Sequence, residues 1–267
     1  MISGWGGLGL LLITAAACDR KPAPPAAAPP PAGSAASAAD ARGRVVFLGT
    51  SLTAGLGLDP AEAYPALLQR KIDSAGLPFA VVNAGVSGET SAGARRRIDW
   101  LMREPAAVLV IETGANDALR GLDVDSLVAN IQAIIDRARQ QVPPPEIVLV
   151  GMRSPPNLGA AYVRRFDAAY ATLARRNGVA LVPFLLEGVA GVDSLNQADA
   201  IHPTAAGQRK LAETVWPAVE RAVERADGRT VRSTASPPDH SARSSDQHLP
   251  QRPHRRVDLG RRVVVMG

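Results

Sequence analysis

The chain has 267 residues, of which 46% are hydrophobic and 21% charged, so it can bury a core and is not disordered throughout. Its 30 basic and 25 acidic side chains give a formal charge of +5, a balance that alone would suggest a nucleic-acid or membrane-surface partner. Residues 229–267 hold eight Arg and three Asp, so the first 228 residues keep 22 basic and 22 acidic side chains and are neutral. We therefore expect no nucleic-acid partner, and nothing in the composition implies a protein partner.

Histidine is just as unevenly placed. His202 is the only histidine in the first 228 residues, and the other three lie in the C-terminal segment at His240, His248 and His254. A histidine-rich metal site in the body of the protein is therefore excluded. We expect no metal and no organic cofactor, and any histidine-dependent chemistry must use His202.

The first 18 residues predict an export signal. Their apolar stretch is short and ends in small residues, which suits a signal better than a membrane span. The run Ala15–Ala17 before Cys18 resembles a bacterial lipoprotein processing site, with Cys18 as the lipid-bearing new N-terminus. The segment lacks Lys or Arg before the apolar run and has Ala15 where Leu is usual. Ordinary cleavage after Ala17 and an uncleaved apolar N-terminus remain open. The expected location is the periplasm, or a membrane to which Cys18 tethers the protein.

Two further segments are expected to lie outside the folded domain. Residues 19–42 are dominated by Pro and Ala, which predicts an extended linker. Residues 228–267 are rich in Arg, Ser, Pro and His without periodicity, which predicts a disordered basic tail. Weak attachment of this tail to anionic lipid and an extension without function both remain open. Cys18 is the sole cysteine, so no internal disulfide is possible.

Residues 43–227 alternate short apolar runs with amphipathic stretches, which predicts a parallel sheet covered by helices on both faces. The expected strands are 45–48, 79–82, 107–111, 147–150 and 179–182. The expected helices are 62–75, 91–102, 122–141, 161–177 and 204–225. We predict one three-layer α/β/α domain with a five-stranded parallel sheet, and Trp100, Met102 and Phe166 in its core.

Polar residues follow the predicted strands, where open parallel sheets bind their ligands. Ser51 follows the first strand, Gly88 the second and Asn116 the third, and Asp199 and His202 precede the last helix. All are expected on one rim of the sheet. Asp117 is expected to be structural, Glu89 and Glu112 to be solvated or orienting charges, and Arg95–Arg97 to form a solvated helix face.

These residue types fit nucleophilic catalysis. A serine hydroxyl needs an adjacent base, and the base needs an acceptor that orients it. His202 is the only base available, and Asp199 can reach its Nδ1–H, which leaves Nε2 to take the proton of Ser51. The N–H groups of Ser51 and Gly88 and the amide of Asn116 could hold an oxyanion, each donor being typically worth on the order of 10²–10³ in rate.

Four blocks together resemble the SGNH, or GDSL-type, hydrolases, nearest to the secreted bacterial arylesterases and the multifunctional thioesterase/lysophospholipases. The blocks are Gly49-Thr50-Ser51-Leu52, Ser87-Gly88-Glu89-Thr90, Gly114-Ala115-Asn116-Asp117 and Asp199-Ala200-Ile201-His202-Pro203. The resemblance spans residues 45–223 and implies a flavodoxin-like fold and a carboxylic ester hydrolase. It also implies a Ser51–His202–Asp199 triad, an oxyanion hole of Ser51, Gly88 and Asn116, and an acyl-enzyme intermediate. The expected substrates are small acyl esters or thioesters, aryl esters among them.

One departure and three open points accompany the resemblance. Thr50 stands where the family has Asp, which puts rate or pH behaviour in doubt but not the reaction class. The segment after the fourth strand lines the acyl site in the resembling thioesterases, so substrate contacts are expected from Ser154, Pro155, Pro156, Asn157 and Leu158. An inert Pro-rich loop is the alternative for that segment. A carbohydrate O-deacetylase on the same machinery and a non-catalytic binding lipoprotein are alternative functions.

Overall fold

Five parallel strands form the centre of the protein in a computed structural model that describes residues 42–234, with side chains up to Arg229. The strands are β1 (Gly43–Gly49), β2 (Phe79–Gly85), β3 (Val108–Glu112), β4 (Glu146–Val150) and β5 (Ala180–Val182). Their order across the sheet is β2-β1-β3-β4-β5. The predicted five-stranded parallel sheet is confirmed.

The central strands are apolar on both faces because helices cover the sheet from both sides. Val45–Leu48 of β1 and Val108–Ile111 of β3 are completely buried. Such continuous apolar runs, rather than an alternation of apolar and polar residues, are what a doubly covered strand requires.

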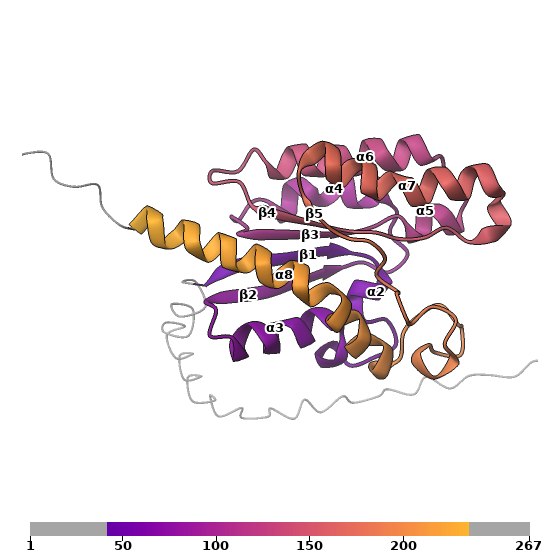
Figure 1. Cartoon of the computed structure of the whole chain (residues 1–267), viewed down its shortest axis with the longest axis horizontal. Helices are drawn as coiled ribbons and strands as arrows, with labels where there is room; N and C mark the ends of the chain where they lie inside the picture. The colour runs from indigo at the N-terminus through magenta and orange to yellow at the C-terminus, as the bar shows by residue number, and fades with distance from the viewer. Residues whose placement is uncertain (1–41, 235–267) are drawn as a thin grey trace, which may run out of the picture. The chain divides into compact units, whose positions relative to one another are not determined.

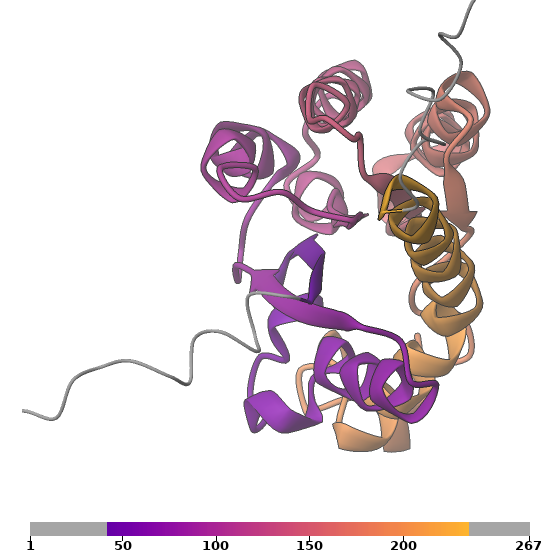
Figure 2. The same ribbon diagram turned by 90° about the vertical axis from the view of Figure 1, so that its left-hand side faces the viewer.

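Two groups of helices make the outer layers (Figure 1). On one face lie α3 (Tyr64–Ser74) and α8 (Ala205–Thr234), which contact each other, and on the other lie α4 (Ser91–Leu101), α6 (Val124–Ala138) and α7 (Ala160–Asn177). Figure 2 shows α8 running from beside α3 toward the edge formed by β4 and β5, which it also contacts. Over residues 42–234, no helix is both long and apolar enough to cross a membrane.

Two predicted helix ends are wrong. The expected helix 122–141 is α6, which begins only at Val124 because Asp123 accepts a hydrogen bond from Ser126 N–H at 2.9 Å and caps it. The last helix, expected to end at 225, continues to Thr234, so residues 228–234 are not part of a disordered tail. Arg225 and Arg229 of α8 both form ion pairs with Glu146 at the start of β4, which fixes this end of the helix against the sheet.

Two of the three predicted core residues are correct. Met102 and Phe166 are buried, whereas the Trp100 side chain on α4 is 63% exposed. The amphipathic spacing of α4 is satisfied by Ala94, Ile98 and Leu101 instead. The predicted signal with Cys18, nearly all of the linker 19–42 and residues 235–267 of the tail lie outside the described residues.

The strand order places a functional site at one point of the sheet edge. From β1 the chain proceeds outward to β2, and from β3 it proceeds outward in the other direction to β4 and β5. The loops that leave the carboxyl ends of β1 and β3 therefore diverge to opposite faces, and a crevice forms between them where ligands bind in sheets of this kind.

Candidate active site

Ser51 is the first residue of a short helix, α2 (Ser51–Ala54), which begins one residue after β1 ends. This tight turn depends on two glycines. A Cβ on Gly49 would lie 2.0 Å from Thr53 Oγ1, and a Cβ on Gly85 of β2 would lie 2.3 Å from Ala54 N. Because neither has a side chain, α2 packs directly against the ends of β1 and β2 and presents Ser51 at the rim of the sheet.

His202 lies between Ser51 and Asp199. Its Nε2 is 2.9 Å from Ser51 Oγ, and its Nδ1 is 2.6 Å from Asp199 Oδ2. A carboxylate on Nδ1 favours the tautomer that carries its proton there, which leaves Nε2 free to accept a proton from the hydroxyl. The structure thus brings together the three residues that the sequence predicted, across 151 positions of the chain.

The turn that carries Asp199 and His202 is wound tightly enough to hold the carboxylate itself. Asp199 Oδ1 accepts the N–H groups of Ile201 and His202, both at 3.0 Å, and Ala200 between them has a left-handed φ of 58°. Hydrogen bonds from the backbone and ring of His202 lower the pKa of Asp199 well below its usual range. Asp199 therefore stays ionised in the folded protein at neutral pH.

Two glutamines fix this turn relative to the serine. Gln197 Nε2 donates to Leu56 O at 2.7 Å, just after α2, and Gln197 N–H donates to His202 O at 2.7 Å. Buried Gln208 of α8 donates to Leu52 O at 3.1 Å and accepts from Tyr64 N–H at 2.8 Å. Elements that are distant in sequence are thus held at a constant separation on both sides of Ser51.

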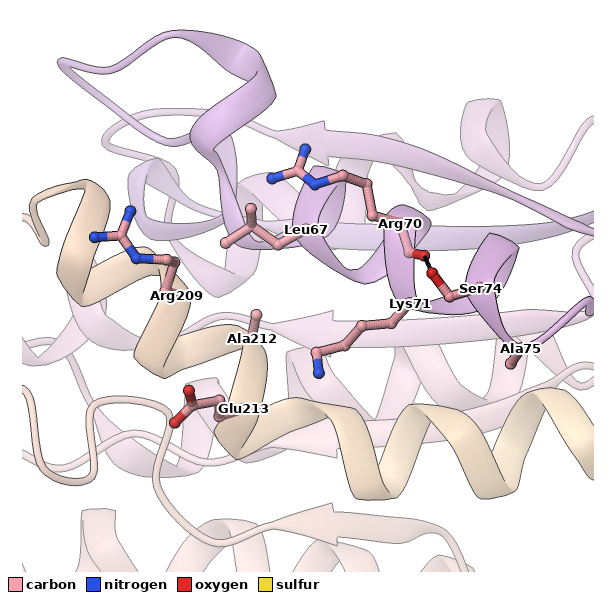
Figure 3. Close-up of a pocket in the computed structure, with 8 residues that line it drawn as sticks. All are labelled: Leu67, Arg70, Lys71, Ser74, Ala75, Arg209, Ala212 and Glu213. Atoms are coloured by element: carbon pink, nitrogen blue, oxygen red, sulfur yellow. Dashed lines mark hydrogen bonds between the residues drawn. The ribbon is translucent and has the colours of Figure 1, made fainter.

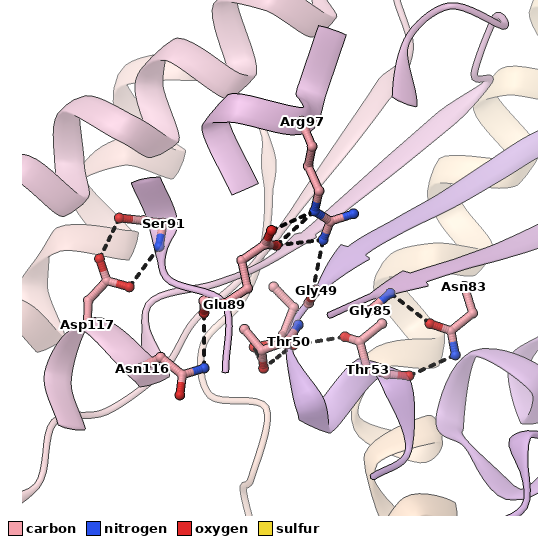
Figure 4. A network of polar contacts seen from close by, with 11 residues as sticks. Gly49, Thr50, Thr53, Asn83, Gly85, Glu89, Ser91, Arg97, Asn116 and Asp117 are labelled. Atoms are coloured by element: carbon pink, nitrogen blue, oxygen red, sulfur yellow. Dashed lines mark hydrogen bonds and ion pairs between the residues drawn. The ribbon is translucent and has the colours of Figure 1, made fainter. Parts of the chain in front are cut away.

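The predicted oxyanion donors face the same cleft as Ser51. Gly88, with a left-handed φ of 75°, and Asn116 of α5 (Ala115–Leu119) both line it. Asn116 Nδ2 donates one hydrogen to Glu89 O at 3.0 Å (Figure 4), which orients the amide and leaves its second hydrogen available. Neighbouring Asp117 is buried and accepts both the N–H and the hydroxyl of Ser91. Its predicted structural role is confirmed.

The cleft at Ser51 has a volume of about 700 Å³ and mostly apolar walls. Ser154, Pro155 and Pro156 line it as predicted, but Asn157 and Leu158 do not. The prediction is wrong for these two because they continue into the 3₁₀ turn η2 (Pro156–Leu158), which carries Leu158 toward Gly121. Sequence reasoning missed five apolar residues of the wall: Leu56, Leu119, Phe184, Leu186 and Ile201. No local pattern marks these residues, which come from four separate loops.

Residues 47–210 match the model of the GDSL-like lipase/acylhydrolase family. The chain belongs to this family. Its expected class, a carboxylic ester hydrolase, is thereby confirmed. The chain is 41% identical to esterase TesA of Pseudomonas aeruginosa over 177 residues, which cover 66% of this chain and 87% of the relative. It is 36% identical to thioesterase 1/protease 1/lysophospholipase L1 of Escherichia coli over 66% of this chain and 82% of that one.

Solved structures agree with this assignment. The crystal structure of TesA superposes with a TM-score of 0.64 at 40% identity and covers 67% of this chain and 99% of that chain. The psychrotrophic esterase EstA from Pseudoalteromonas, in a structure inhibited by monoethylphosphonate, gives a TM-score of 0.64 at 30% identity. It covers 68% of this chain and 98% of its own.

Beneath the nucleophile of this GDSL-like hydrolase lies a completely buried carboxyl group, Glu112. It accepts the N–H of Thr50 at 2.8 Å, the Thr50 hydroxyl at 3.0 Å and the Thr53 hydroxyl at 2.8 Å. Burial raises the pKa of Glu112, and these hydrogen bonds lower it in part. Of the two predicted roles, the solvated charge is wrong, since Glu112 is enclosed and orients the turn that carries Ser51.

The hydrolase has a second hollow that carries no catalytic chemistry. It measures about 630 Å³ and lies between α3 and α8 (Figure 3). Arg70, Lys71 and Arg209 border it, and its one hydroxyl, on Ser74, donates to Arg70 O at 2.7 Å. Within residues 42–234, no group of three or more His, Cys, Asp or Glu side chains is arranged to hold a metal ion.

Proposed function

We propose that this protein is a serine ester hydrolase that works through an acyl-enzyme, with Ser51 as nucleophile, His202 as general base and acid, and Asp199 as the residue that orients His202. The observation that carries the proposal is the continuous contact from Asp199 Oδ2 through both ring nitrogens of His202 to Ser51 Oγ, 2.6 and 2.9 Å long. It ends in a cleft large enough for an acyl ester.

In the first half of the reaction, Ser51 Oγ bonds to the carbonyl carbon while its proton passes to His202 Nε2. The carbonyl oxygen becomes an oxyanion, which the N–H groups of Ser51 and Gly88 and the amide of Asn116 stabilise. The bond to the leaving group then breaks, and His202 returns the proton to the departing oxygen or sulfur. Asp199 stabilises the imidazolium ion that exists between these two transfers.

In the second half, water attacks the acyl-enzyme by the same route. His202 takes one proton from the water, and the new oxyanion occupies the same donors. The bond from the carbonyl carbon to Ser51 Oγ then breaks, the proton returns to Ser51, and the carboxylic acid leaves. The cycle needs no group beyond those of the chain.

The substrates we propose are acyl esters or thioesters with small or medium acyl groups, aryl esters among them. The apolar wall formed by Leu119, Phe184 and Leu186 favours a hydrocarbon chain over a sugar, because it offers no hydrogen bonds to hydroxyl groups. Relatives that carry the names esterase, arylesterase and thioesterase 1/lysophospholipase L1 support the same range. From residues 1–18 alone, we also propose that the enzyme is exported and that Cys18 is its lipid anchor.

A fluorophosphonate probe tests the mechanism. We expect one probe per chain, attached to Ser51, as a relative inhibited by monoethylphosphonate suggests. Ser51→Ala should abolish labelling, and both Ser51→Ala and His202→Ala should lower kcat for p-nitrophenyl butyrate by on the order of 10⁶-fold. Ser74→Ala, which removes a hydroxyl in the hollow between α3 and α8, serves as the matched control. Labelling at another residue, or ester hydrolysis by Ser51→Ala at the wild-type rate, would refute the proposal.

A further inference from the structure

The loop that carries Gly88 is held by an ion pair that the proposed mechanism does not use. Glu89, the next residue, accepts Arg97 Nε at 2.8 and 2.9 Å and Arg97 Nη2 at 2.6 Å. Only 10% of the Glu89 side chain and 19% of the Arg97 side chain are exposed. The prediction of a solvated arginine face is therefore wrong for Arg97, although Arg95 and Arg96 are exposed.

Arg97 also reaches the strand that leads to the nucleophile. Its Nη2 donates to Gly49 O at 3.2 Å, and Gly49 is the last residue of β1, two positions before Ser51. Val86 N–H donates to the same carbonyl oxygen at 2.9 Å. One guanidinium thus contacts both the end of the nucleophile strand and the loop of the oxyanion donor (Figure 4).

Glu89 joins the second oxyanion residue to this contact. While its carboxylate binds Arg97, its carbonyl oxygen accepts Asn116 Nδ2 at 3.0 Å. The position of Glu89 therefore sets the orientation of the Asn116 amide and, through the adjoining peptide, the direction of the Gly88 N–H. A displacement of Glu89 would move two of the three proposed donors together.

The sequence of α4 is adapted to this ion pair. Gly93 and Arg97 are one helical turn apart and lie on the same face. A Cβ on Gly93 would lie 2.6 Å from Glu89 Cγ, so the Glu89 side chain passes directly over Gly93 to reach Arg97. Glycine weakens the interior of a helix, and here its lack of a side chain makes the room that Glu89 occupies.

We infer that Arg97 is a positioning residue for the oxyanion hole. Through Glu89 and Gly49 O it holds the Gly88 N–H and the Asn116 amide at a fixed distance from Ser51, so that both donors are in place before the oxyanion forms. This inference rests on the proposed function. Because preorganised donors act mainly in the transition state, loss of Arg97 should lower kcat and leave KM nearly unchanged.

The test compares Arg97→Met, Glu89→Gln and the double variant on p-nitrophenyl butyrate. A misplacement of about 1 Å in an active site costs about 10²-fold in rate, so we expect each single variant to lose about 10- to 100-fold in kcat. KM should change by less than about threefold, since ground-state contacts remain. The double variant should be no slower than the slower single variant, because both changes break one contact. Arg96→Met, on the exposed face of the same helix, should match the wild type.

Further measurements separate positioning from loss of the fold. The phosphonate probe should still label every chain of Arg97→Met, only more slowly. Arg97→Lys keeps the charge but not the two-point contact, and it should lose several-fold in kcat at an unchanged melting temperature. Wild-type kcat in Arg97→Met or Arg97→Lys, a change confined to KM, or losses that multiply in the double variant would each overturn the inference. An unlabelled wild type would instead refute the proposed function.

Discussion

At the scale of single residues, Thr50 is the position where this hydrolase departs from its family. In place of an aspartate, Thr50 gives the buried Glu112 carboxyl two hydrogen-bond donors, its N–H and its hydroxyl. The other ionisable groups around Glu112 are Tyr64, which reaches it through Thr53, and Tyr170. Burial raises the pKa of both tyrosines, so neither ionises in the range where a carboxyl titrates. Glu112 is therefore the titrating group beneath Ser51.

Thr50→Asp should make stability depend on pH. The change places a second carboxyl beside Glu112, and two adjacent carboxylates cannot easily both be ionised. The folded-state pKa of one of them rises above its unfolded value, so this contribution to stability is present at low pH and is lost as the pH rises through the folded value. We expect the melting temperature of Thr50→Asp to fall below that of the wild type by an amount that grows from pH 5 to pH 9.

Thr50→Ser keeps a hydroxyl donor and adds no charge, so its difference from the wild type should be the same at every pH. An equal difference between Thr50→Asp and the wild type at pH 5 and pH 9 would show that the introduced carboxyl does not share the site of Glu112. Thermal unfolding monitored by circular dichroism measures both series.

The residues that form the triad could be predicted from sequence because each follows a recognisable strand and only one histidine was available. The residues that orient them could not. Glu112 and Glu89 lie in the same blocks, but a charged residue after a strand looks the same whether it faces solvent or a buried threonine. Arg97 differs from Arg96 only by about 100° around a helix, and that angle acquires meaning only once Glu89 is seen to cross Gly93.

At the scale of elements, the position of Ser51 depends on how closely α2 approaches β2. A Cβ on Gly85 would lie 2.3 Å from Ala54 N and 2.8 Å from Thr50 O, both backbone atoms of the turn that carries the nucleophile. Backbone atoms cannot rotate away as a side chain would. Any side chain at position 85 must therefore displace α2 or the end of β2.

Gly85→Ala should accordingly affect both stability and turnover. Overpacking of this kind costs about 1–3 kcal/mol, which lowers the melting temperature of a domain of this size by roughly 2–4 °C for each kcal/mol. The displaced Ser51 should also lower kcat. Gly228→Ala is the control, since nothing lies within 4 Å of a Cβ there, and alanine should stabilise helix α8 by up to about 1 kcal/mol. Unchanged kcat in Gly85→Ala would contradict the close approach.

The strands could be predicted more reliably than the helix ends. A buried parallel strand is a short apolar run, and all five runs were found within a few residues of their observed bounds. Helix ends depend on contacts made at a distance. The start of α6 depends on the cap by Asp123, and the end of α8 depends on Glu146, which lies 79 and 83 positions before the two arginines it binds.

At the scale of the whole molecule, the charge of the chain and its chemistry are separate. All residues of the cleft lie between Thr50 and His202, in the part of the sequence that is neutral overall, whereas the net charge of +5 comes from residues 229–267. Arg229 is the one of these basic side chains that the described part of the chain places, and it pairs with Glu146. That pair lies at the amino end of β4, whereas Ser51 follows the carboxyl end of parallel β1, so the two lie at opposite edges of the sheet.

Two truncations test this separation. Removal of residues 235–267 should leave kcat/KM for p-nitrophenyl butyrate within about twofold of the full chain, because neither the cleft nor α8 is altered. Removal of residues 228–267 also deletes the last turns of α8 and the Arg229–Glu146 ion pair. A partly exposed pair is worth about 0–1 kcal/mol, so this variant should melt a few degrees lower and keep its turnover at 25 °C. If removal of 235–267 abolished turnover while the melting temperature stayed unchanged, the basic segment would have to act in catalysis, and the enzyme could not be assigned to residues 42–234 alone.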